Sequence, residues 1–268
     1  MNLVKRTATA VVLLGSLFVI IQYAPDSAFF LFGLAFSAAA LLEFYSLAGA
    51  KGLRPQKVLG TALGSLVLLT YYVRGIPTDA ALFAAVLVSG VYFLVTINTA
   101  EKLAHFPASF VATLAGVLYV SFTLGFVFRI RLELGPFYLY FLAAIVFLGD
   151  TGAFFIGKPF GRHKMTPIAS PNKSWEGSAG GFLFAVGGAL LARFILLPAV
   201  PIATTVLTAL IVHAAAQVSD PLESLFKRAV GVKDSSNFLP GHGGFLDRID
   251  SLILAGPLFY FIVRYIWK

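Results

Sequence analysis

Long apolar stretches, separated by short polar segments, follow one another along almost the whole chain. A helix needs about 20 mostly apolar residues to cross the hydrocarbon core of a bilayer, and most of these stretches come close to that length. The pattern predicts an all-α, polytopic integral membrane protein with about nine transmembrane helices. Their expected ranges are 7–23, 27–48, 58–73, 80–97, 107–128, 136–156, 177–197, 201–218 and 250–267.

The composition agrees with this pattern. Of the 268 residues, 59% are hydrophobic and only 12% are charged, whereas an ordinary globular domain has about 25% charged residues. The chain has no cysteine, which excludes disulfides and thiolate metal sites. In a membrane protein, the net charge of +8 reflects topology and contact with anionic lipid, so no nucleic-acid partner is expected.

The distribution of lysine and arginine predicts how the spans are oriented. With nine spans and a cytoplasmic N-terminus, fourteen of the 20 basic residues lie on the cytoplasmic side, as the positive-inside rule requires. Two long polar loops, 157–176 and 219–249, then lie on this same side and can build one site. The chain therefore divides into N-terminal scaffold helices, 1–135, and a C-terminal region, 136–268, which carries both polar loops. We expect it in the cell's inner (cytoplasmic) membrane.

The most polar run, Ser224–Asp250, combines basic residues, carboxylates and glycines. Gly241, Gly243 and Gly244 free the backbone for unusual dihedral angles and for close approach to a ligand. Basic side chains bind phosphate oxygens, backbone N–H groups cradle them, and carboxylates hold a divalent cation. The run has the composition of a polyphosphate–metal site, and an ordinary cytoplasmic loop between two membrane helices is the alternative.

Three aspartates are candidate ligands of a divalent cation. Asp247 and Asp250 are three residues apart at the start of the last span, so on one helix both carboxylates would project from the same side. Asp220, followed by Pro221 where the helix should be disturbed, supplies a third carboxylate. Mg²⁺ usually takes one or two protein carboxylates together with substrate phosphates and water. Helix capping is the alternative role for Asp247.

Three ionisable residues lie inside predicted spans, namely Glu43, Asp150 and His213. A charge at a helix centre costs about 2.5–3.5 kcal/mol on insertion scales. Glu43 faces either a polar cavity or water at the interface. Asp150 is favoured as a functional residue, and Gly149 and Gly152 beside it allow close helix approach. His213 is favoured as a packed histidine that is hydrogen-bonded to a neighbouring helix.

The other polar loop contains the turn Ser170-Pro171-Asn172-Lys173-Ser174, followed by Trp175 and Glu176. The segment that begins at Ser174 could cap the next helix. A turn with hydroxyls, an amide and an amine suits phosphate and base binding. A positively charged loop that contacts anionic lipid head groups explains the same residues equally well.

The run from Ser224 to Asp250 resembles the signature of the phosphatidate cytidylyltransferases, also called CDP-diacylglycerol synthases. The motif resemblance covers roughly residues 147–251 and includes Asp150-Thr151-Gly152-Ala153 and the segment 170–177. The first half of the chain matches only as a set of apolar spans. The matching signature positions are Ser224, Lys227-Arg228, Lys233-Asp234, Ser236, Pro240, His242-Gly243-Gly244, Asp247-Arg248 and Asp250.

The resemblance implies a membrane nucleotidyltransferase of phospholipid synthesis that is a homodimer. It would join CTP and phosphatidate to give CDP-diacylglycerol and pyrophosphate at the cytoplasmic face, with Mg²⁺ and a second, monovalent cation such as K⁺. The expected catalytic residues are Asp220, Lys227, Arg228, Asp247, Arg248 and Asp250, of which Asp220, Asp247 and Asp250 are the metal ligands. The expected CTP-binding residues are Asn172, Lys173, Ser174, Glu176, Lys233, Asp234, His242, Gly243 and Gly244.

Two other functions are compatible with parts of the sequence. A related CTP-dependent lipid enzyme, such as a CDP-archaeol synthase or a polyprenol kinase, would share the nucleotide site, but the full signature favours phosphatidate as the acceptor. A secondary transporter could use Glu43, Asp150 and His213 as an ion path. It would have inverted repeats and polar groups near mid-membrane, whereas the polar residues here concentrate in the second half of the chain.

Overall fold

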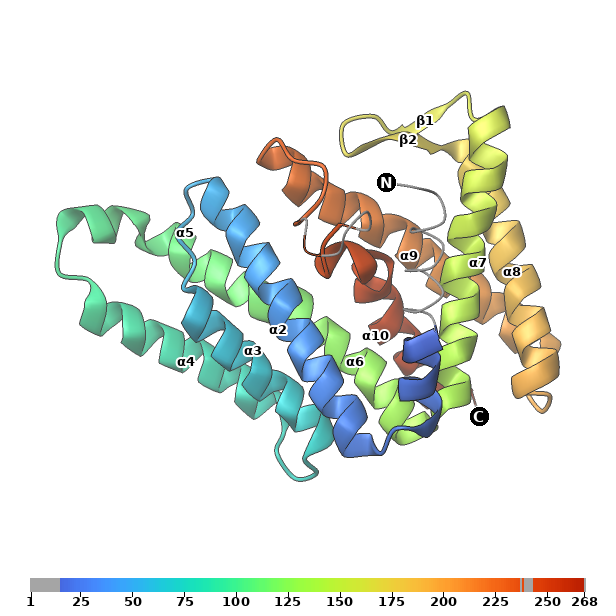
Figure 1. Ribbon diagram of the computed structural model, residues 1–268, viewed down its shortest axis with the longest axis horizontal. Coiled ribbons are helices and arrows are strands. Elements are labelled where there is room, and N and C mark those ends of the chain that lie inside the picture. The colour runs from blue at the N-terminus through green and yellow to red at the C-terminus, as the bar shows by residue number, and fades with distance from the viewer. Residues whose placement is uncertain (1–14, 237, 239–242, 268) are drawn as a thin grey trace. The chain divides into compact units, whose positions relative to one another are not determined.

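The computed structural model describes residues 15–236, 238 and 243–267. These residues form helices and one two-stranded hairpin (Figure 1). They belong to two compact units, one made of Met1–Ser121 with Asp234–Arg248 and the other of Phe122–Lys233 with Ile249–Lys268. The predicted boundary after residue 135 separates a scaffold from a functional region. The two packing units do not test a difference in role, so this boundary stays a prediction.

The first unit is a group of antiparallel helices to which one segment from late in the chain is added. α2 packs against α3, α3 against α4, and α4 against α5 (Figure 1). The 3-10 turn η3 packs against α2. Residues 15–23 are also helical. The elements are α2 (Asp26–Ala50), α3 (Lys57–Tyr72), α4 (Thr78–Thr96), α5 (Ala100–Gly116), the π-helical η1 (Val117–Phe122) and η3 (Leu246–Arg248).

The second unit is built around two long helices, α7 and α8, which pack along most of their length (Figure 1). α9 packs against both α8 and α10. The hairpin of β1 and β2 is antiparallel and was not expected in an all-α protein. The elements are α6 (Thr123–Arg129), the π-helical η2 (Ile130–Leu134), α7 (Pro136–Phe160), β1 (Lys164–Thr166), β2 (Ser170–Ser174), α8 (Trp175–Leu196), α9 (Ile202–Ala229) and α10 (Asp250–Tyr265).

Glycines bring α7 and α8 close together. A Cβ atom on Gly157 would lie 3.2 Å from the Cα of Gly177, and a Cβ on Gly180 would lie 2.5 Å from the Cβ of Ile156. Small residues at a helix contact let two backbones approach, which is a common way to join helices in lipid. Close approach of backbones, predicted for Gly149, Gly152 and Gly157, is confirmed at Gly157, whereas Gly149 and Gly152 face the side chains of His213 and Phe184.

Within the described part of the chain, six helices are long and apolar enough to cross a membrane. The chain is thus an all-α, multi-pass membrane protein. α3 is apolar but shorter, and α10 has 16 residues. The predicted count of nine spans and the orientation of the N-terminus stay predictions. The six helices are Asp26–Ala50, Thr78–Thr96, Ala100–Leu134, Pro136–Phe160, Trp175–Leu196 and Ile202–Ala229.

The prediction of a loop from residue 219 was wrong for its first part, because α9 continues through Pro221 to Ala229. A proline inside a helix removes one N–H donor, which bends or weakens a helix but does not always end it. The 28 residues of α9 correspond to roughly 42 Å, which exceeds the thickness of the hydrocarbon core of about 30 Å. The last turns of α9 can therefore carry polar residues beyond the core.

We expect Gly180→Ala to destabilise the protein. The added methyl would overlap Ile156, and overpacking of this kind costs about 1–3 kcal/mol. Gly187→Ala in the same helix is the matched control, because a Cβ there meets no atom within 4 Å. Thermal unfolding of the two purified variants in detergent checks this, and equal midpoints would contradict the contact described between α7 and α8.

Candidate active site

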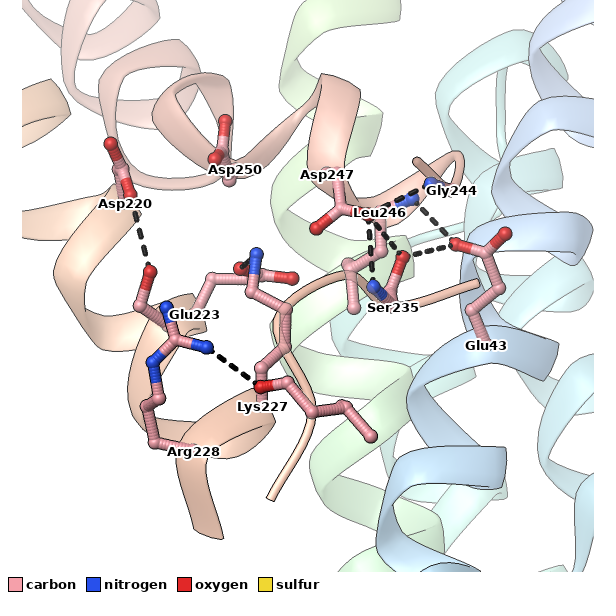
Figure 2. Close-up of polar contacts among 12 residues, drawn as sticks. Glu43, Asp220, Glu223, Lys227, Arg228, Ser235, Gly244, Leu246, Asp247 and Asp250 are labelled. Carbon is pink, nitrogen blue, oxygen red and sulfur yellow. Dashed lines mark hydrogen bonds and ion pairs between the residues drawn. The ribbon is translucent and has the colours of Figure 1, made fainter. Parts of the chain in front are cut away.

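In the first unit, Asp247 folds the segment that carries it. Its Oδ2 accepts hydrogen bonds from the backbone N–H groups of Ser235 (2.9 Å) and Gly244 (2.8 Å) (Figure 2). Gly243 has a φ of 76°, which L side chains rarely adopt, and a Cβ there would lie 2.6 Å from Asp247 Oδ2. Both glycines thus serve the fold of this segment, and their predicted contact with CTP stays a prediction.

Glu43 joins this same segment from α2. The carboxylate is 8% exposed and accepts hydrogen bonds from the hydroxyls of Ser235 and Ser236 and from the N–H groups of Phe245 and Leu246. Glu43 thus contacts polar groups of its own protein, which favours the first of its two interpretations, and its position relative to the membrane interface stays a prediction.

Asp247 and Asp250 do not lie on one helix, so that part of the metal prediction was wrong. Asp247 belongs to η3, and α10 begins only at Asp250. The hydrogen bonds of Asp247 hold η3 to Ser235 and Gly244, and the backbone changes direction at Ile249 (φ −117°, ψ −1°). Asp247 is part of the first unit and Asp250 of the second, so a metal shared by the two stays a prediction.

The second unit gathers three carboxylates from three helices, namely Asp150 of α7, Asp220 of α9 and Asp250 of α10. Ser251 Oγ lies 3.2 Å from Asp150 Oδ2 and 3.4 Å from Asp250 Oδ1. Asp250 is close enough to Asp220 and Asp150 for their charges to act on it. The Ser219 hydroxyl donates to the backbone carbonyl of Asp250 and so ties α9 to the start of α10.

Lys173 of β2 brings the hairpin to this acidic group. Its Nζ lies 2.9 Å from Asp220 Oδ2, and both side chains are half-buried. Asp220 Oδ1 also accepts a long hydrogen bond from Ser224 (3.4 Å; Figure 2). The expectation that the two polar segments of the second half meet is confirmed at this ion pair.

The three aspartates do not by themselves complete the ligand shell of a metal ion. Among the residues that the structure describes, no three His, Asp or Glu side chains form a group that could hold a metal ion. Mg²⁺ needs only one or two protein carboxylates when phosphates and water complete its shell. A Mg²⁺ site formed by Asp220 and Asp250 together with substrate phosphates therefore stays a prediction.

The predicted phosphate-binding cations have different surroundings. Lys227 is buried and forms an ion pair with Glu223, one turn earlier in α9. Arg228 donates to the carbonyl of Val232 at 2.8 Å (Figure 2). Lys233 and Arg248 are exposed, as is Asp234. Glu223 was not predicted as part of a pair, although its spacing of four residues from Lys227 would have indicated one if the helix had been extended past Pro221.

The residues before α8 hold the hairpin in place. Ser174 Oγ accepts from the N–H of Gly177 at 3.1 Å, so the predicted helix cap is confirmed. The Glu176 carboxylate accepts from the N–H groups of Arg162 (3.1 Å) and His163 (3.2 Å) and lies 2.6 Å from His163 Nδ1. Asn172 is exposed. The predicted contacts of Asn172, Ser174 and Glu176 with CTP stay predictions.

His213 is a buried, hydrogen-bonded residue, as expected, but the expectation that its partner lies on a neighbouring helix was wrong. Gln217 donates to His213 Nε2 at 2.8 Å and to the carbonyl of Ser178 at 3.1 Å. A Cβ on Gly181 would lie 2.6 Å from His213 Nε2, so the ring fills space that this glycine leaves. The hydrogen-bond partner of His213 is on its own helix, and Gln217 makes the link to α8. His242 lies outside the described residues.

The chain is similar to known proteins over nearly its full length. The sequence pattern of the Cytidylyltransferase family matches residues 4–266. A phosphatidate cytidylyltransferase of Haemophilus influenzae is 33% identical over 97% of this chain and 99% of its own length. One of Brucella suis is 32% identical over 97% of this chain and 92% of its own length. One of Bacillus subtilis is 37% identical over 56% of each chain.

We expect removal of either partner of the Glu223–Lys227 pair to destabilise the protein. Removal of one member of a buried ion pair costs about 3–5 kcal/mol, so Glu223→Gln and Lys227→Met should each lower the unfolding temperature. The unfolding temperature of the double variant should fall by less than the sum of the decreases in the two single variants.

Arg54 and Glu101 form an exposed pair at 2.8 Å and provide the control for this cycle. Arg54→Met with Glu101→Gln should change the unfolding temperature little, because solvent screens exposed pairs. Strict additivity of the Glu223 and Lys227 variants would show that the two side chains are not coupled.

Proposed function

Because the chain belongs to the cytidylyltransferase family, we propose that it transfers the cytidylyl group of CTP to phosphatidate. The products are CDP-diacylglycerol and pyrophosphate. Relatives named phosphatidate cytidylyltransferase that align with nearly the whole chain support this activity. The structural observation that carries the proposal is the group of Asp150, Asp220 and Asp250, which helices of a membrane protein place beside Lys173.

The reaction follows from the charges of the two substrates. A phosphate oxygen of phosphatidate attacks the α-phosphorus of CTP, and pyrophosphate leaves. A phosphate monoester is already an anion near pH 7, since its second pKa is about 6, so no strong general base is needed. The tasks left to the protein are to position two anionic phosphates and to neutralise their charge.

Asp220 and Asp250 are the proposed holders of Mg²⁺, and Asp247 is the third predicted ligand. When bound, the ion supplies positive charge against the phosphate oxygens. Lys173, which neutralises Asp220 in the structure, is placed to donate to a phosphate oxygen near the same carboxylate. A monovalent cation such as K⁺ is part of the same proposal.

The orientation of the protein follows from where its substrates are found. CTP is dissolved in the cytoplasm and phosphatidate lies in the bilayer, so the polar segments should face the cytoplasm. We therefore propose nine spans with a cytoplasmic N-terminus in the inner membrane, which agrees with the excess of lysine and arginine on that side. A homodimer is proposed on the family resemblance alone.

The purified protein in detergent should release pyrophosphate only when CTP, phosphatidate and Mg²⁺ are all present. Omission of the lipid or addition of EDTA should stop the release, and K⁺ should be varied separately. Release with CTP and a different lipid acceptor would keep the nucleotide chemistry and replace the proposed acceptor. Absence of release with any acceptor, in protein with a normal unfolding transition, would overturn the proposal.

Asp250→Asn should lower turnover by about 100-fold or more, because removal of fixed charge at a reacting phosphate has effects of that size. Asp220→Asn should lower turnover to a similar extent. Asp79→Asn is the matched control, since Asp79 is an exposed residue in the first turn of α4 and outside the proposed site. Near-normal turnover of both site variants would remove these aspartates from the metal assignment.

A further inference from the structure

Glu43 has all of its hydrogen-bonding capacity directed at one segment of the first unit. Oε1 accepts from Ser236 Oγ (2.6 Å) and from the N–H of Phe245 (3.1 Å). Oε2 accepts from Ser235 Oγ (2.8 Å) and from the N–H of Leu246 (2.9 Å) (Figure 2). A carboxylate has about four acceptor positions, so every position of Glu43 is used.

From this geometry we infer that Glu43 is a positioning residue for the reaction, whose carboxylate anchors the segment that carries Asp247. The hydroxyl donors of Ser235 and Ser236 lie at the start of this segment, and the N–H donors of Phe245 and Leu246 lie directly before Asp247. One side chain on α2 thus holds both ends. The link to catalysis rests on the proposed function, whereas the anchoring itself does not.

Ser235 connects the Glu43 carboxylate to Asp247. Its hydroxyl lies 2.8 Å from Glu43 Oε2 and 2.9 Å from Asp247 Oδ2, and its backbone N–H donates to Asp247 at 2.9 Å. A hydroxyl has only one proton to donate, so the two carboxylates share it. A change at Glu43 should therefore alter the position of Asp247, although Glu43 itself touches no reacting group.

The surroundings of Glu43 explain two features of the signature segment. A Cβ on Gly244 would overlap both Glu43 Oε2 and Ser235 Oγ, so a glycine is required there by the anchor, before any ligand is considered. Phe36, two turns before Glu43 on α2, packs edge-on against Phe245 at 4.9 Å between ring centroids. This contact adds apolar packing between α2 and the segment that Glu43 anchors.

The same geometry separates this role from an ion path. A carboxylate that relays ions needs acceptor positions that open to the transported ion. Glu43 is 8% exposed, and its four positions are occupied by donors of its own protein. The transporter interpretation therefore finds no support at this residue.

The test compares Glu43→Gln with Glu133→Gln in the purified full-length protein. Glu133 is a suitable control because its carboxylate also sits in a membrane helix and accepts from Arg129 and Tyr260. Glutamine has one acceptor oxygen, so Glu43→Gln should raise amide hydrogen exchange of Phe245 and Leu246 by about tenfold or more. It should also lower kcat at saturating CTP and phosphatidate by about tenfold or more, while Glu133→Gln changes kcat less than twofold.

The outcomes are distinct. Unchanged exchange at Phe245 and Leu246 in Glu43→Gln would overturn the anchor. Faster exchange with normal kcat would overturn the positioning role, because the segment could then loosen without effect on the reaction. An equal loss of kcat in both variants would also overturn it, since general destabilisation would suffice. If Glu43→Gln does not fold, Ser236→Ala, which removes one of the four donors, takes its place in both measurements.

A wild-type protein that shows no activity with CTP and any lipid would count against the proposed function alone. The exchange measurement needs no substrate and would still decide whether Glu43 anchors the segment. Partial recovery of kcat in Glu43→Asp, which keeps the charge on a shorter side chain, is the result expected of positioning by a carboxylate.

Discussion

A carboxylate among apolar helices needs hydrogen-bond donors or positive charge within its own protein, because neither lipid nor packed side chains can solvate it. Glu43 meets this need with four donors of one segment, Glu223 with the buried ammonium of Lys227, and Glu133 with Arg129 and Tyr260. These pairings attach polar segments to apolar helices. The partners of Glu43 and Glu223 are thus those that a buried acid requires, and Glu133, which is exposed, has partners of the same kind.

The group of Asp150, Asp220 and Asp250 satisfies this need in a different way. Three helices bring these like charges within range of one another, an arrangement that is unfavourable unless positive charge compensates it. Lys173 supplies part of that charge. In the proposed reaction a bound Mg²⁺ would supply more positive charge beside Asp220 and Asp250. An excess of acid that would weaken a purely structural cluster is therefore consistent with the proposed cation.

The local pattern predicted the apolar helices well and the polar connections less well. Span ranges followed from the lengths of apolar runs, and the cap at Ser174 followed from its residue type. The helix past Pro221, the hairpin of β1 and β2, and the separation of Asp247 from Asp250 were missed. The separation of Asp247 from Asp250 follows from the hydrogen bonds that hold Asp247 to Ser235 and Gly244, and no periodicity along the chain predicts those contacts.

The sequence by itself determined that the chain is an all-α membrane protein and, through its signature run, which chemistry to expect, because both depend on residue types at short spacing. Only the tertiary structure decided what Glu43 does. Its partner Ser235 is 192 residues away along the chain, and no periodicity or spacing relates the two positions. Likewise, only the packing of α7 against α10 places Asp150 beside Asp250 through Ser251, since hydrogen bonds depend on distance in space.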